Sequence, residues 1–270
     1  MQEVWARFEV LGADLHGATG IGLGIAGFAS APDTSRALLA ALAGWRPDLR
    51  HVLAGDATTS HTGALGGRPG VVLAVGTGSV ALAVRADGGS AIVDGWGFVL
   101  GDEGSGYAVG RAGLVAALRH ADGRGGSAEL LERAVRAWGP VGSLPRMLYA
   151  QPNLASAVAA FAPEVAAATV DGDQVARGIW VDAARALVAT ATAAAAQADP
   201  AAPVAVTGGL LDVGEVLTAP LGELWEAAHG ARRPLQPAQG DAVSGAALLV
   251  SRDDLPHAAL TMRHEPAGTG

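Results

Sequence analysis

Hydrophobic and polar residues in the first quarter of the chain follow an order typical of an α/β fold. Apolar residues spaced by glycine predict a strand at 20–26, and the start signals Ser30 and Pro32 predict a helix at 33–43. A further apolar run predicts a strand at 50–55. A strand, a helix and a strand in this order indicate two parallel strands joined by a right-handed crossover.

The pattern then changes to short apolar runs separated by glycine-rich turns, at 71–75, 80–85 and 91–94, which predicts an antiparallel meander. The tail from Asp253 contains two prolines and two glycines, so we expect it to be loosely ordered. Between these segments we expect one strand, at 203–209, and helices at 106–119, at 128–138, at 154–169 with a break at Pro163, at 174–197, as two short segments within 213–228, and at 241–250.

Composition removes several classes of chemistry from consideration. The 270 residues include no cysteine, and all 18 side chains counted as Lys or Arg are arginine. The chain therefore has no P-loop lysine, no Schiff-base lysine, no thiol nucleophile and no cysteine-held iron–sulfur cluster. Neither HExxH nor G-x-S-x-G occurs. Carboxylates, hydroxyls and backbone amides remain as the groups that can carry chemistry.

Charge and hydropathy indicate the setting in which the chain works. The net charge is −8, with no basic cluster beyond Arg232 and Arg233, which argues against a nucleic-acid partner. No apolar run of about 18 residues or more occurs, and the first residues lack a signal-peptide pattern. We therefore expect a cytoplasmic protein with no membrane partner.

Residues 22–27 match GxGxxG, a motif of dinucleotide sites. Such a site needs the glycines to open a helix directly after the strand, whereas Pro32 and Asp33 place the helix start several residues later. We therefore favour a glycine-spaced strand that other backbone approaches closely.

Asp56 directly follows the predicted strand at 50–55, at the end of a parallel sheet where α/β proteins bind ligands. Its carboxylate can accept a proton from a substrate hydroxyl, or it can cap the helix that follows. Position alone leaves both roles open.

Two glycine-rich turns also follow predicted strands. The turn 76–79, GTGS, offers consecutive amides and two hydroxyls that can bind phosphate without lysine, or it is only a hairpin turn. The glycine pair 208–209 lets an adenine or ribose approach the backbone, or it only turns the chain.

The stretch GWGFVLGDEGSG, at 95–106, combines glycines, a tryptophan and two acids. Asp102 and Glu103 precede a predicted helix, where the helix macrodipole favours acids and Ser105 can serve as the cap. Trp96 is either a core anchor or a surface for substrate.

Taken in order, four segments resemble the BadF/BadG/BcrA/BcrD ATPase family, with the N-acetylglucosamine kinase branch as the most similar. They are HVLAGDA (51–57), VVLAVGTGSVAL (71–82), DGWGFVLGDEGSGYAVG (94–110) and VAVTGG (204–209), and the resemblance covers about residues 20–250. It implies an α/β, actin/hexokinase-like fold of two RNase H-like domains, with ATP and sugar in the cleft between them. The domains would be 1–66 plus 240–270 and 67–239.

The resemblance also implies roles for individual residues. Asp56 would be the general base that takes the proton of the sugar 6-hydroxyl, and Mg²⁺ would arrive with ATP, with no metal ligand assigned. A homodimer is implied by analogy. The phosphate loop would be Gly76, Thr77, Gly78 and Ser79, the sugar contacts Gly95, Trp96, Gly97 and Asp102, and the adenosine contacts Gly208 and Gly209.

The chain also departs from the family pattern. The D-x-G-x-T hairpin that opens the family, its first phosphate loop, does not occur, so we expect an incomplete N-terminal domain and weak or no activity of the chain as written. A misplaced start codon is the favoured explanation, and a non-catalytic sugar-binding or regulatory protein is the alternative. Val80 stands where acetylglucosamine kinases carry a polar residue, so glucosamine or another hexose stays open as substrate. The absence of cysteine argues against the family's iron–sulfur activator branch.

Overall fold

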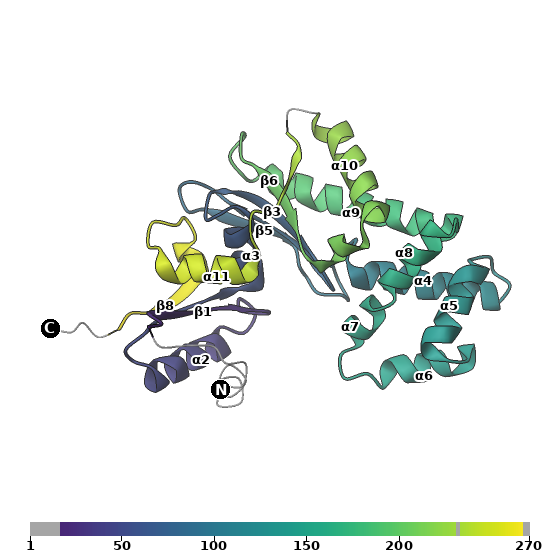
Figure 1. The fold of residues 1–270 in the computed structure, drawn as a ribbon, viewed down its shortest axis with the longest axis horizontal. Coiled ribbons are helices and arrows are strands. Elements are labelled where there is room, and N and C mark those ends of the chain that lie inside the picture. Colours follow the sequence, from purple (N-terminus) through teal and green to yellow (C-terminus); the bar gives the residue numbers. More distant parts are fainter. Residues whose placement is uncertain (1–16, 231–232, 267–270) are drawn as a thin grey trace.

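The computed structural model describes residues 17–230 and 233–266, which form two β-sheets and the helices around them (Figure 1). The smaller sheet has the strand order β1-β2-β8, and the larger has the order β5-β4-β3-β6-β7. The strands are β1 (Gly20–Ile25), β2 (Arg50–Gly55), β3 (Gly70–Val75), β4 (Ser79–Val84), β5 (Ser90–Asp94), β6 (Val204–Thr207), β7 (Leu235–Pro237) and β8 (Thr261–His264).

Most helices lie on the side of the larger sheet, whereas α2, α3 and α11 accompany the smaller one (Figure 1). Among the described residues, no helix is long and apolar enough to cross a membrane. The helices are α2 (Pro32–Trp45), α3 (Asp56–Ala64), α4 (Gly106–Ala121), α5 (Ala128–Trp138), α6 (Leu144–Tyr149), α7 (Leu154–Ala159), α8 (Ala162–Val170), α9 (Gln174–Ala195), α10 (Glu215–His229) and α11 (Ala242–Ser251), with 3₁₀ turns η1 (Val141–Ser143), η2 (Gly209–Val213) and η3 (Ala258–Leu260).

The first strand, helix and second strand form the parallel unit that the sequence predicts. β1 pairs with β2 in parallel, with Gly20 opposite Arg50, and α2 carries a proline in its first turn. A Cβ at Gly22 would overlap the carbonyl oxygen of Ala246 on α11. The glycines of β1 are therefore needed for close helix packing, which confirms the close approach of other backbone, although the strand is only partly buried.

The larger sheet contains the predicted meander. β3, β4 and β5 are consecutive antiparallel strands, and β6 adds to β3 in parallel. The long helix α9 packs against β3, β4 and β5, with Trp180 and Leu187 fully buried. This packing forms the main hydrophobic core and leaves the turns at the strand ends free to build a site.

The helical part agrees with prediction at Pro163, differs from it at α10, and includes a helix, α6, that the sequence pattern did not predict. The helix expected at 154–169 is broken near Pro163 into α7 and α8, with Phe161 buried between them. The two short helices expected within 213–228 are instead one helix, α10, which contains Pro220. A proline there removes one backbone hydrogen bond, and burial of Leu217 and Trp225 on the same helix outweighs that loss.

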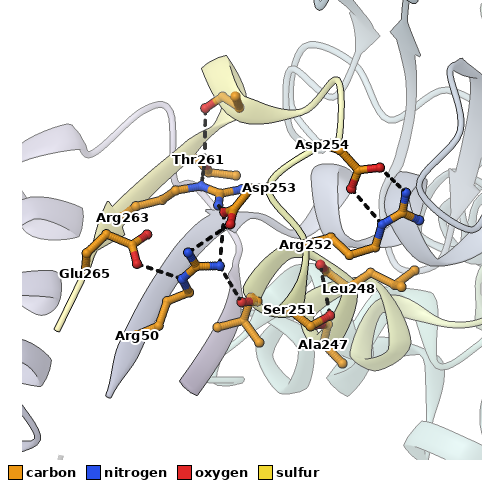
Figure 2. Close-up of polar contacts among 12 residues, drawn as sticks. Arg50, Ala247, Leu248, Ser251, Arg252, Asp253, Asp254, Thr261, Arg263 and Glu265 are labelled. Atoms are coloured by element: carbon orange, nitrogen blue, oxygen red, sulfur yellow. Dashed lines mark hydrogen bonds and ion pairs between the residues drawn. The ribbon is translucent and has the colours of Figure 1, made fainter. Parts of the chain in front are cut away.

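The tail beyond Asp253 is not loosely ordered as far as residue 266, so that prediction was wrong. β8 pairs antiparallel with β2, placing His264 opposite His51. Arg50 on β2 forms ion pairs with Asp253 at 3.0 Å and with Glu265 at 2.8 Å (Figure 2). Proline and glycine content is a local signal, whereas the order of this segment comes from pairing with a strand about 200 residues earlier.

Candidate functional site

Two glycine segments meet at one end of the larger sheet. β3 and β6 run parallel, with Ala74 opposite Thr207, so the residues that follow both strands emerge at the same edge. These are the turn Gly76–Ser79, here called the glycine turn, and the pair Gly208–Gly209. A Cβ at Gly208, where φ is +115°, would overlap the carbonyl oxygen of Val75. Only glycine lets the two segments approach so closely.

The glycine turn presents amide groups beside a helix N-terminus. The carbonyl oxygens of Gly76 and Thr77 accept hydrogen bonds from the first amides of α4, Gly106 at 2.9 Å and Tyr107 at 3.0 Å. Within the part of the chain that the structure describes, the amides of Thr77 and Gly78 have no intramolecular acceptor. Open amides near the positive end of a helix favour an anion such as phosphate.

Ser79 is occupied differently from its neighbours in the turn. Its side chain is buried, its amide donates to Oδ1 of Asp102 at 3.2 Å, and its hydroxyl donates to the carbonyl oxygen of Glu103 at 2.8 Å. Ser79 therefore links the glycine turn to the acidic stretch that follows β5.

In the acidic stretch after β5, which contains Asp102 and Glu103, the contacts centre on Asp102. The residue has a left-handed backbone, with φ of 57°, and its amide donates to Oδ1 of Asp94 at 2.8 Å. Burial raises the pKa of the Asp102 carboxyl, the hydrogen bond from Ser79 lowers it, and the negative charge of Asp94 raises it. The net effect is a carboxylate that holds its proton more readily than an exposed one.

Residues 95–101, here called the tryptophan loop, project from the end of β5. Trp96 is 75% exposed, so the interpretation as a core anchor is wrong. Gly95 and Gly97 on either side have φ of 73° and 82°, conformations that favour glycine. The cap role expected of Ser105 is confirmed, since its hydroxyl accepts from the amide of Ala108 at 3.2 Å.

A cavity of about 550 Å³ lies beside the glycine turn. Gly76, Thr77 and Gly209 form one side of it, so both glycine segments line the same space. Its volume is within the ordinary range for small-molecule sites. The other walls come from α7, α8 and η2, including Ser156, Pro163, Leu210 and Asp212. These wall residues carry no signal in the sequence, because nothing in an Ala-rich helical pattern marks one face as a pocket wall.

Asp56 lies apart from these segments. It is the exposed first residue of α3, directly after β2, and α3 contacts strands of both sheets. The helix N-cap is Gly55, so the alternative that Asp56 caps the helix is wrong. The Asp56 carboxylate accepts the amide of Ala57 at 2.9 Å. Within the described ranges, no hydrogen bond or ion pair joins Asp56 to the glycine turn or the tryptophan loop.

Known proteins resemble this chain both in sequence and in structure. A curated relative, the N-acetylmuramic acid/N-acetylglucosamine kinase of Clostridium acetobutylicum, is 32% identical over 139 residues, which are 50% of this chain and 45% of the relative. The aligned region thus spans less than half of that relative's length.

Two solved structures have the same fold. A provisionally assigned N-acetylglucosamine kinase from Chromobacterium violaceum matches with a TM-score of 0.72 and 28% identity, over 90% of this chain and 80% of that one. One from Porphyromonas gingivalis, also provisionally assigned, matches with a TM-score of 0.67 and 22% identity, over 88% and 79% of the two chains.

These matches confirm the predicted α/β, actin/hexokinase-like fold class. The prediction of two domains, 1–66 plus 240–270 and 67–239, stays a prediction, although the two sheets and the packing of α11 on α3 agree with it. A profile of the BadF/BadG/BcrA/BcrD ATPase family matches residues 1–250. The chain therefore belongs to the BadF/BadG/BcrA/BcrD ATPase family.

Proposed function

We propose that this chain is an ATP-dependent sugar kinase that phosphorylates the 6-hydroxyl of N-acetylglucosamine or a related amino sugar. One observation carries the proposal: the glycine turn borders a cavity of about 550 Å³ and is bonded, through Ser79, to the segment that contains Asp102. Phosphate-binding amides and a candidate sugar segment are thus parts of one connected structure. The similar proteins are named as N-acetylglucosamine kinases, which supports this proposal.

ATP is proposed to bind along the glycine turn and the cavity. The open amides of Thr77 and Gly78 would face the phosphates, and the pair Gly208–Gly209 would lie against the nucleoside. No cluster of three or more His, Asp or Glu side chains in the described part of the chain forms a metal cage. Mg²⁺ is proposed to arrive bound to the phosphates and to neutralise charge there.

The sugar is proposed to bind at the tryptophan loop. The exposed ring of Trp96 offers an apolar face to a pyranose ring, and the flanking Gly95 and Gly97 let the backbone approach it. Asp102 would accept hydrogen bonds from sugar hydroxyls, either through its ionised carboxylate or through the free lone pairs of the carboxyl group.

Asp56 is proposed as the general base. Its carboxylate would accept the proton of the 6-hydroxyl as that oxygen bonds to the γ-phosphorus, while the bond from phosphorus to the β,γ-bridging oxygen breaks and ADP leaves. Asp56 begins the helix that contacts both sheets, so closure of the two sheets around bound ligands would bring it to the other groups.

A coupled assay of ADP release with a panel of hexoses and amino sugars tests the function. We expect at most weak turnover with an amino sugar, and we expect Asp56→Asn to reduce kcat by about a hundredfold or more. The matched control is Asp33→Asn, which alters an exposed aspartate near the start of α2 and should leave kcat unchanged. Absence of ADP release with every sugar would refute the kinase.

The alternative, a non-catalytic sugar-binding or regulatory protein, is favoured by the separation of Asp56 from the other segments. Calorimetric titration with the same sugars distinguishes the two: binding without turnover would support the alternative. Homodimer formation and a cytoplasmic location are likewise proposals, and sedimentation of the purified chain tests the first.

A further inference from the structure

Asp94, the last residue of β5, accepts two hydrogen bonds from the far end of the tryptophan loop. Its Oδ1 accepts from the amide of Asp102 at 2.8 Å, and its Oδ2 accepts from the amide of Glu103 at 2.9 Å. Hydrogen bonds to an ionised acceptor are stronger than neutral ones. The Asp94 side chain, which lies outside residues 95–101, thus joins the two ends of this loop.

The backbone at both ends of this closure is unusual. Asp94 has φ of 61° and Asp102 has φ of 57°, and these are the non-glycine residues with positive φ in the described part of the chain. Such conformations cost free energy and persist where the surroundings hold them. The bonds from the amides of Asp102 and Glu103 to the Asp94 carboxylate help to hold the second of these residues in place, together with the bonds that Asp102 accepts from the amides of Ser79 and Ser105.

Apolar packing does little to hold the tryptophan loop. Trp96, Val99 and Leu100 are 75%, 76% and 83% exposed. Phe98 makes one ring contact, with Tyr107 at 4.9 Å between centroids. Because the loop buries so little surface, its position depends on the polar anchor at its ends.

The hydrogen bonds to the Asp94 carboxylate also set the direction of the Asp102 side chain. The Asp102 carboxylate lies against the glycine turn, where it accepts from the amide of Ser79 at 3.2 Å. A Cβ built at Gly78 would lie 2.9 Å from the carboxylate, so the side chain fits closely over the turn. A change at Asp94 therefore moves a carboxylate that is bonded to the glycine turn through the Ser79 amide, although Asp94 itself need not contact a ligand.

Only a short carboxylate can fill this role. It offers two acceptor oxygens, one for each amide, whereas asparagine offers one oxygen and a pair of donors that would face an amide. The negative charge is also close enough to Asp102 to raise the pKa of that carboxyl. Asp94 thus affects both where the Asp102 carboxylate lies and how readily it ionises.

We propose that Asp94 is a positioning residue of the sugar site: it fixes the amides of Asp102 and Glu103 and so aims the Asp102 carboxylate. This inference rests on the proposed function, in which Asp102 contacts the sugar. It goes beyond it by assigning a role to a residue that contacts neither ligand.

Steady-state kinetics of Asp94→Asn and Asp94→Ala test the inference. Loss of one charge-assisted hydrogen bond should raise the sugar KM by about tenfold in D94N, and D94A should raise it further, with the ATP KM within about twofold of wild type. The control is Asp87→Asn, since Asp87 also accepts a turn amide, that of Gly89 at 2.8 Å, in the hairpin before β5. D87N should leave both KM values unchanged.

The pH profile separates positioning from simple structural support. Because the charge of Asp94 raises the pKa of Asp102, the D94N variant should move the acid limb of the sugar KM profile to lower pH. An unchanged sugar KM in both Asp94 variants, or equal increases in the sugar and ATP KM values, would overturn the inference.

Hydrogen exchange of the ligand-free chain provides a readout that does not need turnover. In D94N, and more in D94A, the amides of Asp102 and Glu103 should exchange faster, as should the amide of Ser79, which donates to the Asp102 carboxylate. No other amide outside residues 94–107 should change, and D87N should change none of these. If the wild-type chain shows no turnover, the kinase proposal fails while this measurement still decides the inference. Unchanged exchange at those two amides would overturn it.

Discussion

A single methyl group at Gly78 is expected to disturb sugar binding without touching the tryptophan loop. A Cβ built there would lie 2.9 Å from Cγ and from both oxygens of the Asp102 carboxylate. The backbone of Gly78 is not left-handed, so alanine is tolerated by the main chain and the collision with Asp102 is the main effect of Gly78→Ala.

The size of the effect follows from the contact distances. Carbon atoms pack best at about 3.5–4.0 Å, so the Asp102 carboxylate must move away by roughly 0.6 Å or more. The hydrogen bond from the Ser79 amide is already 3.2 Å long and does not survive such a shift. Losing a hydrogen bond to a charged group costs about 1.5–3 kcal/mol, which corresponds to an increase of roughly 10- to 150-fold in the sugar KM.

The same turn contains the control. Gly76 has no atom within 4 Å of a built Cβ, so Gly76→Ala adds the same methyl group to the same turn without a collision. The sugar KM of G76A should stay near wild type, and any effect should fall on the ATP KM, because Gly76 lines the cavity. The assay is ADP release over a range of sugar concentrations, with the sugar Kd from calorimetry and the melting temperature measured alongside.

The reasoning would be refuted if G78A and G76A had the same sugar KM and Kd. It would also be refuted if G78A raised the ATP KM and the sugar KM by the same factor, because the three atoms nearest to the added methyl group all belong to the Asp102 carboxylate. A melting temperature of G78A more than about 10 °C below wild type would show that the methyl group disrupts the fold rather than one side chain.

Three further predictions concern stability. Burial lowers the pKa of His61 to about 4 and that of His257 to about 3. The free energy of unfolding should therefore be highest above pH about 6.5, where both histidines are neutral, and should fall as the pH drops toward 4. Denaturant unfolding at a series of pH values measures it, and a flat profile would contradict this prediction. Gly245→Ala places a Cβ against a backbone carbonyl of α3, so it should destabilise by about 1–3 kcal/mol or more, whereas Gly44→Ala, with open space at its Cβ, should not. Ser105→Ala removes the side-chain cap of α4 and should cost about 1 kcal/mol in the same assay, measured against wild type.

Local signals were enough for much of the fold. The strand at 50–55 and the helix at 128–138 have the bounds that their hydrophobic patterns predict, and the antiparallel meander and the break near Pro163 are also confirmed. These features depend on periodicity, turn glycines and proline, which act over a few residues. The glycine spacing of β1 belongs with them, because it predicts close approach, although not by which helix.

The rest depended on contacts distant in sequence. β8 and the tail were missed because their order comes from β2, and the cavity walls of α7, α8 and η2 were missed because nothing local distinguishes a wall from a core face. The structure brings several candidate residues to one edge of the larger sheet: the glycine turn, Asp102 and the pair Gly208–Gly209. Asp56 lies elsewhere, at the start of α3.

The sequence by itself determined most of the elements, the family and the short list of groups able to carry chemistry, since these are set by residue type and near neighbours. Only the tertiary structure decided how those groups are arranged. It showed that Trp96 is exposed, that Ser79 is a link between two segments, and that Asp94 holds Asp102. The physical reason is that hydrogen bonds between β4, the end of β5 and the start of α4 form only when the sheet has assembled, so no local pattern contains them.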